Sequence, residues 1–336
     1  MLRRILAAAM LVILALALLV VAWPQLFSLQ RSPGVAQAVS LRGLAIAAAA
    51  VAVVGLLLVI AISSRLRRFA ASAAVLLLGF ALLNTAVVAT RGIGNPAFAT
   101  AAPASITVLA WNTLGDAPGV DAIAELALDT GADVVVLPET SKATSDEVAS
   151  VMLAAGRQMQ PFTVAFDQIS KARSTGLLIS SDLGTYVVDE SEPNSVVLPT
   201  VIARPADGTG PTIMAVHLVA PIPGELHNWQ TDLAWMSAAC SEPSTIIAGD
   251  FNATLDHFSG LATAEGATIG DCADAADASE NAGLGTWPTA LPALLGAPID
   301  HVMATQNWRV TGMRVIEDHD KHGSDHRPVL AQLTPR

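Results

Sequence analysis

Two short polar motifs near the C-terminal end of the chain could assemble a catalytic or metal site. Gly-Asp-Phe-Asn at 249–252 follows the apolar run 245–248, and Ser-Asp-His-Arg-Pro at 324–328 precedes the apolar run 329–331. If both runs are strands, the end of one and the start of the other can meet at one edge of a sheet. Carboxylate oxygens bind hard divalent cations, and histidine is the usual general acid or base near neutral pH. The two motifs therefore predict a metal ion and a proton-transferring group at the same sheet edge.

Further polar residues stand at the ends of other apolar, strand-like runs. They are Asn112, Glu139, His217, Asp300 and His301, next to the runs 106–110, 134–138, 212–216 and 299–304. Each has an ordinary interpretation when taken alone, because Asp and Asn favour turns, an acid can cap a helix, and a histidine can be a satisfied core residue. The core of a sandwich does not need six such strand ends, so their number favours a functional site.

In this order, these residues resemble the endonuclease/exonuclease/phosphatase family, the metal-dependent phosphoesterases that include DNase I, abasic-site endonucleases, inositol-phosphate phosphatases and bacterial sphingomyelinases. The resemblance covers residues 106–333 and rests on Trp-Asn at 111–112, Leu-Pro-Glu at 137–139, His217, Ile-Asp-His at 299–301 and the two motifs above. It implies an α/β fold of the DNase I type, a four-layer α/β/β/α sandwich, for a catalytic domain at 106–336. Strand-like runs mixed with a few helical patterns indicate the same layered class.

The resemblance also implies a metal site. Glu139 looks like the main carboxylate ligand of a Mg²⁺ or Mn²⁺ ion, and Asn112 and Asp325 look like its neighbours, directly or through water. A divalent ion held by few carboxylates neutralises phosphate charge and leaves positions for water and substrate.

The remaining matched residues look catalytic. Asp250 and Asn252 would orient the attacking water and the phosphoryl oxygens, and His326 would be the catalytic histidine, oriented by Asp300. His217 matches the histidine that nuclease members place across the phosphate. We expect His301 to be structural or to support a neighbouring site residue, and Trp287 to pack at the rim of the site. The implied activity is hydrolysis of a phosphodiester or phosphomonoester by a metal-activated water.

Charge divides the chain into two parts. Eight arginines and no acidic residue precede Asp116, whereas all 29 acidic and the other ten basic residues follow the first part, which gives +8 and −19. The first part contains three uncharged apolar runs, 5–23, 43–62 and 70–90, each long enough to cross the ~30 Å hydrocarbon core as a helix. We therefore predict a three-helix membrane anchor at 1–91 and a multi-pass location in the cell membrane.

The arginines also predict an orientation. Five of them, at 3–4 and 65–68, lie on one side of the membrane, against three at 31, 42 and 91 on the other. Because positive residues are retained in the cytoplasm, the C-terminal domain is expected to be extracytoplasmic. Residues 92–105 are rich in small residues and are expected to be a flexible linker. Cys240 and Cys272 could form a disulfide outside the cytoplasm, or could be two buried thiols.

Local patterns predict the elements of the domain. Strands are expected at 106–110, 134–137, 177–180, 196–203, 212–216, 245–248, 299–304, 310–316 and 329–333. Helices are expected at 120–130, at 146–155 after Ser145 as the N-cap, and around the face formed by Leu226, Trp229, Leu233 and Met236.

The reaction class is better determined by the sequence than the substrate is. Duplex DNA binding depends on Lys and Arg, and ten such residues in a domain of net charge −19 disfavour a dedicated duplex nuclease. The expected partners are the bilayer and a phosphoester substrate: a lipid headgroup, a small phosphoester or a nucleic acid. Two alternatives stay open, a nuclease of the same fold and a catalytically silent binding domain on a membrane anchor.

Overall fold

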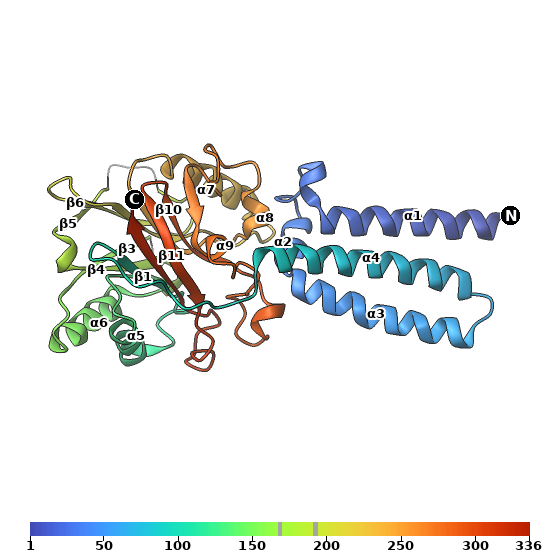
Figure 1. The fold of residues 1–336 in the computed structure, drawn as a ribbon, viewed down its shortest axis with the longest axis horizontal. Coiled ribbons are helices and arrows are strands. Elements are labelled where there is room, and N and C mark those ends of the chain that lie inside the picture. Colours follow the sequence, from blue (N-terminus) through green and yellow to red (C-terminus); the bar gives the residue numbers. More distant parts are fainter. Residues whose placement is uncertain (167–169, 191–193) are drawn as a thin grey trace.

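The chain forms an elongated helical bundle joined to an α/β sandwich (Figure 1). The structure is a computed structural model, and it describes residues 1–166, 170–190 and 194–336. The bundle contains α1 (Leu2–Ala22), α3 (Arg42–Ile62) and α4 (Arg67–Arg91), with η1 (Pro24–Phe27) and α2 (Val35–Ser40) between α1 and α3. The N-terminus and the α3–α4 turn lie at the end of the bundle far from the sandwich.

Within the described residues, α1, α3 and α4 are three helices long and apolar enough to cross a membrane. They have 21, 21 and 25 residues, and ~20 helical residues span the hydrocarbon core. Large apolar side chains such as Ile13, Val51 and Leu82 are exposed along them. The helices coincide with the three predicted runs to within a few residues.

The described part of the sandwich contains two six-stranded sheets. The first sheet has the order β11-β12-β1-β2-β4-β3 and the second has the order β5-β6-β7-β8-β10-β9. The bounds are β1 (Ile106–Ala110), β2 (Val134–Pro138), β3 (Met159–Ala165), β4 (Ser174–Ser180), β5 (Tyr186–Val188), β6 (Val201–Pro205), β7 (Thr212–His217), β8 (Thr245–Asp250), β9 (Cys272–Asp274), β10 (Asp300–Thr305), β11 (Trp308–Val315) and β12 (Val329–Pro335).

Helices cover the outer face of each sheet. On the first sheet lie α5 (Gly119–Asp129) and α6 (Lys142–Ala154), and on the second lie α7 (Leu226–Ala239) and α8 (Leu255–Phe258). The short elements η2 (Lys171–Arg173), η3 (Ser181–Leu183), α9 (Ala275–Ala278) and η4 (Ala293–Leu295) lie in the connections. The predicted four-layer α/β/β/α sandwich is confirmed.

Alternation along the strands explains the layers. Val108 and Ala110 of β1 point into the core between the sheets, whereas Leu109 packs under α5 and α6. Ile246 and Ile247 of β8 divide in the same way between the central core and the layer under α7. Strands that are buried on both faces have to be apolar at every position, which is why they read as continuous apolar runs.

The strand register brings the predicted site residues to one edge of the sandwich. β7 and β8 are parallel, with His217 opposite Asp250, and β10 is antiparallel to β8, with Asp300 opposite Asp250. In the other sheet, β1 and β2 are parallel, and β12 is antiparallel to β1 with its first residue, Val329, opposite Ala110. The ends of four strands and the starts of two therefore face each other.

Several local predictions were wrong. The run 196–203 is a strand only from Val201, and β3, β5 and β9 were not predicted, because short or partly polar strands leave little alternation to detect. The N-cap of α6 is Ser141 instead of Ser145: its Oγ accepts a hydrogen bond from the Thr144 N–H (3.3 Å), and Ser145 lies inside the helix.

The segment 92–105 has no helix or strand, but it is held along the sandwich. Asn95 exchanges two hydrogen bonds of 3.0 Å with the backbone of Val315, and the Ala99 N–H donates to the Thr311 oxygen (3.0 Å). The expected flexible tether is therefore a strap along β11. Among the alternatives for the cysteines, the structure has the disulfide, Cys240–Cys272, which joins the end of α7 to β9.

A buried ion cluster fastens the bundle to the sandwich. Asp256 of α8 is 2% exposed, and its two oxygens accept from Arg42 Nε (2.9 Å) and Nη2 (2.6 Å). Arg91 Nη1 lies 2.8 Å from the same carboxylate, and Arg42 Nη1 also donates to the carbonyl of Ala22 (3.1 Å). One carboxylate thus joins the sandwich-proximal ends of α1, α3 and α4. We call Asp256, Arg42 and Arg91 the junction cluster.

Glycine allows a second close contact at this junction. A Cβ on Gly43 would lie 1.8 Å from the Leu294 carbonyl oxygen, so the start of α3 can approach η4 only without a side chain there.

Candidate active site

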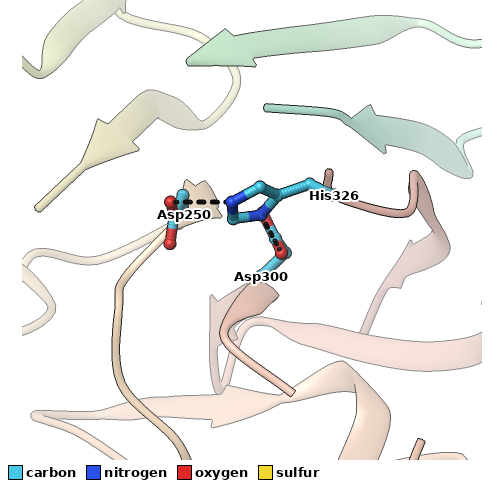
Figure 2. Close-up of side chains that lie close together, drawn as sticks. All are labelled: Asp250, Asp300 and His326. Carbon is cyan, nitrogen blue, oxygen red and sulfur yellow. Dashed lines mark hydrogen bonds and ion pairs between the residues drawn. The ribbon is translucent and has the colours of Figure 1, made fainter. Parts of the chain in front are cut away.

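His326 stands between two aspartates at the sheet edge. Its Nδ1 lies 2.9 Å from Asp300 Oδ2, and its Nε2 lies 3.8 Å from Asp250 Oδ2 (Figure 2). Asp300 begins β10 and Asp250 ends β8 directly opposite it, so the register of one strand pair places both carboxylates. An imidazole fixed at one nitrogen by a carboxylate presents its other nitrogen in a defined direction.

The backbone of His326 is fixed by residues of the first sheet, whereas Asp250 and Asp300 belong to the second sheet. Trp111 Nε1 donates to the His326 carbonyl (2.9 Å). Ser324 Oγ accepts from the His326 N–H (3.1 Å) and donates to the carbonyl of Asn112 (2.6 Å). These bonds tie the start of β12 to the end of β1 within the first sheet, and the His326 side chain reaches from there to Asp300 and Asp250 of the second sheet.

Asn112 connects the carboxylates of the two sheets. Its Nδ2 donates to Glu139 Oε1 (3.2 Å) and to Asp250 Oδ2 (3.1 Å), while its Oδ1 accepts from the Leu114 N–H (3.0 Å). His217 Nε2 lies 3.7 Å from Glu139 Oε1 and 4.0 Å from Asp250 Oδ2. Glu139, at the end of β2, is therefore part of the same cluster as Asp250 and His217.

Two of the site residues have left-handed backbone conformations. The φ angle is +58° at Glu139 and +47° at Asn252. Asn252 donates from its N–H to Asp250 Oδ1 (2.8 Å) and from Nδ2 to Asp250 Oδ2 (3.2 Å) and to the Leu218 carbonyl (2.9 Å). Backbone strain of this kind is retained where the surrounding structure holds a functional side chain in place.

Asp325 lies at the rim of the site beside Trp287. Trp287 Nε1 donates to Asp325 Oδ2 (2.8 Å), whereas Asp325 Oδ1 is buried and has no hydrogen-bond partner among the described residues. Asp325 Oδ1 lies 4.0 Å from His326 Nε2. An unpartnered carboxylate oxygen facing this cluster is available to a cation.

A cavity of about 550 Å³ opens over the cluster. Six of the predicted site residues line it: Glu139, His217, Asp250, Asn252, Asp325 and His326. Asn112 and Asp300 are buried behind these residues and hold Glu139, Asp250 and His326 from below. Gln37, Ser40, Trp287 and a set of aliphatic side chains complete the lining, and the volume is in the usual range of small-molecule sites.

Comparison with known proteins identifies the family. Residues 109–326 match the Endonuclease/Exonuclease/phosphatase family. The chain belongs to this family. No curated protein is similar enough to the chain to count as a match.

Several solved structures share the fold of this chain. A Bacteroides vulgatus endonuclease/exonuclease/phosphatase is 16% identical with a TM-score of 0.50, covering 69% of this chain and 99% of its own. A Beutenbergia cavernae endonuclease/exonuclease/phosphatase is 21% identical with a TM-score of 0.50, covering 69% and 72%. The Leishmania major AP endonuclease is 13% identical with a TM-score of 0.50, covering 74% and 95%.

Burial and neighbouring charges shift the pKa values of the residues in the candidate site. Burial raises the pKa of Asp250 and of Glu139. Burial acts to lower the pKa of His326, but the carboxylates of Asp300 and Asp250 outweigh it and raise that pKa. Burial lowers the pKa of His217 to about 3, so its imidazole is neutral near pH 7. The site therefore combines a protonated and a neutral imidazole.

The donor set fits a hard divalent cation. Glu139, Asp250, Asp300 and Asp325 place four carboxylates in one cluster, and no ion pair of the described residues joins any of them to Lys or Arg. Among the described residues, the group whose ligand atoms lie within 4.8 Å of one another is Asp250, Asp300 and His326. The Nδ1 of His326 is already hydrogen-bonded to Asp300, so we favour oxygen ligands from the carboxylates that line the cavity.

Other residues that position the site were not predicted. Thr286 Oγ1 accepts from the N–H groups of Ile299 (3.1 Å) and Asp300 (3.2 Å) and fixes the start of β10. The buried Arg327 guanidinium donates to the Leu291 carbonyl (2.7 Å) and to Asp320 (2.5 Å) and holds the loop around Trp287. Their types and spacing give no signal, because each acts through contacts that are made only in the fold.

His301, expected to be structural, is buried away from the cavity. Its Nδ1 lies 2.6 Å from Asp274 Oδ2 and its Nε2 donates to the Ala253 carbonyl (2.9 Å). It thereby supports the loop that carries Asn252.

Proposed function

We propose that the protein is a membrane-anchored, divalent-metal-dependent phosphoesterase that hydrolyses a phosphodiester or phosphomonoester. The observation that carries the proposal is the Asp300–His326–Asp250 arrangement, which lies beside Glu139 and His217 under a cavity large enough for a substrate. Membership of a family of nucleases and phosphatases supports the same reaction class.

Each residue has a role that its contacts support. Asp250, held by Asn112 and Asn252, orients the attacking water and accepts its proton, for which a raised pKa is suitable. His326, charged and held by Asp300, stabilises the negative charge that develops on the phosphoryl oxygens. His217, which is neutral, donates from Nε2 to a phosphoryl oxygen on the opposite side.

Glu139 and Asp325 are the proposed metal ligands, with Asn112 as a neighbour through water. When bound, Mg²⁺ or Mn²⁺ supplies Lewis-acid polarisation of the phosphate and balances the four carboxylates. The buried, unpartnered oxygen of Asp325 supports this assignment.

The bundle is proposed to cross the membrane with the sandwich outside the cytoplasm. Five arginines, at 3–4 and 65–68, lie at the end of the bundle far from the sandwich. The other three, at 31, 42 and 91, are bound by the sandwich through carbonyl oxygens or Asp256. The free positive charge is thus concentrated on the proposed cytoplasmic side, and the Cys240–Cys272 disulfide suits an oxidising compartment.

A matched set of assays tests the proposal. The full-length protein in detergent micelles, assayed with Mg²⁺, should hydrolyse at least one member of a panel containing nucleic acid, phospholipids with sphingomyelin, and inositol phosphates. Turnover should disappear with a chelator and return with excess Mg²⁺. Hydrolysis of nucleic acid alone would favour the nuclease alternative. If no member of the panel is hydrolysed, the alternative of a catalytically silent binding domain would be favoured.

A further inference from the structure

One wall of the cavity comes from outside the sandwich. Gln37 and Ser40 of α2, together with Leu41, line the same cavity as Asp250 and His326. These three residues belong to the connection between α1 and α3, so the N-terminal part of the chain contributes to the candidate site. We call residues 37–41 the α2 wall.

The α2 wall is fixed in place by the sandwich. His257 Nε2 donates to the Ala36 carbonyl (3.1 Å), and Gln37 Nε2 donates to the carbonyl of Pro221. Ala36 is fully buried among side chains of the layer beneath α7. Immediately after the wall, Arg42 is held by Asp256 in the junction cluster. Because the wall is bonded at both ends, its position relative to the cluster at the candidate active site is defined.

The cavity combines an ionisable and an aliphatic lining. Beside the cluster of Asp250 and His326, its lining includes Leu41 of the α2 wall and Val219, Pro221 and Ile222 from the loop after β7. Ile222 is 52% exposed, so its side chain has apolar area that a bound group can cover. A substrate that carries an apolar group next to its phosphate would cover these side chains and be stabilised by the burial.

The wall also lies where the proposed membrane surface begins. Leu41 directly precedes Arg42, the first residue of α3, and the ends of α1 and α4 meet at the same level through Asp256. Trp23 and Phe27, next to the end of α1, are exposed large apolar residues, and aromatic side chains are enriched at the headgroup level of membranes. A lipid phosphate at this depth could enter the cavity while its chains stay in the bilayer.

We propose that the substrate is a membrane lipid phosphoester, with its phosphate at His326 and Asp250 and the first carbons of its apolar part against Leu41. This inference rests on the proposed phosphoesterase function. The N-terminal bundle then does more than attach the enzyme, because the α2 wall is a specificity-determining part of the active site.

Matched substrates test this proposal in the full-length protein in detergent micelles with Mg²⁺. Methyl and hexadecyl p-nitrophenyl phosphodiesters differ only in the apolar group, and methyl and hexadecyl phosphate form the corresponding monoester pair. Leu41→Gln should raise KM for the hexadecyl ester by a factor about tenfold larger than the factor by which it changes KM for the methyl ester. Leu26→Gln is the control, because Leu26 is exposed in the same connection but does not line the cavity.

The outcomes separate this inference from the function on which it rests. If Leu41→Gln and Leu26→Gln behave alike on the hexadecyl ester while wild type hydrolyses both esters, the lipid proposal is wrong and the phosphoesterase stands. If wild type hydrolyses none of the four esters but does hydrolyse nucleic acid or inositol phosphates, the lipid proposal is wrong and the phosphoesterase stands. If it hydrolyses none of these compounds and no phospholipid, both proposals fail. Ser40→Trp, which adds bulk to the α2 wall, gives a second test: KM for the hexadecyl ester should rise, and an unchanged KM would contradict the proposal. Activity on the methyl ester shows that each variant is folded.

Discussion

The molecule contains two buried groups of charged side chains that differ in how their carboxylates are paired. In the junction cluster, one aspartate, Asp256, meets two guanidinium groups, and every charge has a partner within 2.9 Å. In the cluster at the candidate active site, the four carboxylates of Glu139, Asp250, Asp300 and Asp325 share two imidazoles, and several oxygens stay 3.7–4.0 Å from the nearest imidazole nitrogen. In the first cluster, the carboxylate is fully paired with guanidinium groups, whereas the second cluster has an excess of negative charge.

The difference is visible in the proton affinities. Burial acts to raise the pKa of Asp256, but the hydrogen bonds and charges of Arg42 and Arg91 outweigh it and hold the pKa well below its usual range. For Asp250 and Glu139 burial prevails, and the pKa is raised. A buried carboxylate that is fully paired with cationic groups holds the structure together. A buried carboxylate without such partners is available to bind a metal ion, a proton or a substrate.

The largest expected effect is on catalysis. His326→Ala should lower kcat by ~10²–10³-fold with a smaller effect on KM, because loss of one group that stabilises the developing negative charge typically costs that much. Asp300→Ala should also lower kcat, and the double variant should lose less than the product of the two factors, because the pair acts as a unit. His227→Ala, an exposed histidine on α7, is the control. Independent, multiplicative losses would show that Asp300 and His326 are not a functional pair.

The junction cluster should respond in stability instead. Asp256→Asn leaves Arg42 buried without its counter-charge, and breaking such a pair typically costs about 3–5 kcal/mol. Thermal unfolding of the full-length protein in detergent should show a clear drop in Tm. Asp146→Asn is the matched control: it removes a pair with Lys142 whose side chains are 45% and 71% exposed, and should cost less than about 1 kcal/mol. Equal losses in the two variants would contradict the special role of Asp256.

Acid should weaken the junction through His257. Burial lowers the pKa of this imidazole to about 4, and its Nδ1 accepts from the Thr254 N–H (2.8 Å) while Nε2 donates to Ala36. The folded state therefore favours the neutral form. Its contribution is complete above the unfolded pKa of ~6.5 and is lost as pH falls towards 4, by about 3 kcal/mol in total. The Tm of wild type should fall more steeply over this range than that of His257→Gln, and parallel curves would exclude this assignment.

The smallest expected effect concerns the metal. Glu139→Gln should weaken Mn²⁺ binding by about tenfold or more, as loss of a charged ligand requires, and leave the Tm of the metal-free protein nearly unchanged or raised. Removing one of several unpaired carboxylates relieves repulsion, in contrast with Asp256→Asn. Titration calorimetry or Mn²⁺ paramagnetic resonance measures the affinity directly. Unchanged Mn²⁺ affinity would remove Glu139 from the ligand set.

The residues of the cluster at the candidate active site could be found in the sequence because each follows or precedes an apolar run. The motif at 249–252 and the Asp-His at 325–326 mark strand ends, and a layered sandwich gathers such ends at one edge. The three apolar helices were equally evident, since length and the absence of charge are local properties. The sequence did not determine which carboxylate oxygens face His326.

The sequence by itself therefore determined the three long apolar helices, most of the strands, the family and the polar residues that the strand ends bring together, because periodicity and strand-end chemistry are written in neighbouring positions. Only the tertiary structure decided the junction cluster, the α2 wall and the course of the segment 92–105. Arg42 and Asp256 are separated by 214 positions, and nothing in either neighbourhood specifies the other. Contacts of this kind depend on how the bundle packs against the sandwich, which is a property of the whole fold.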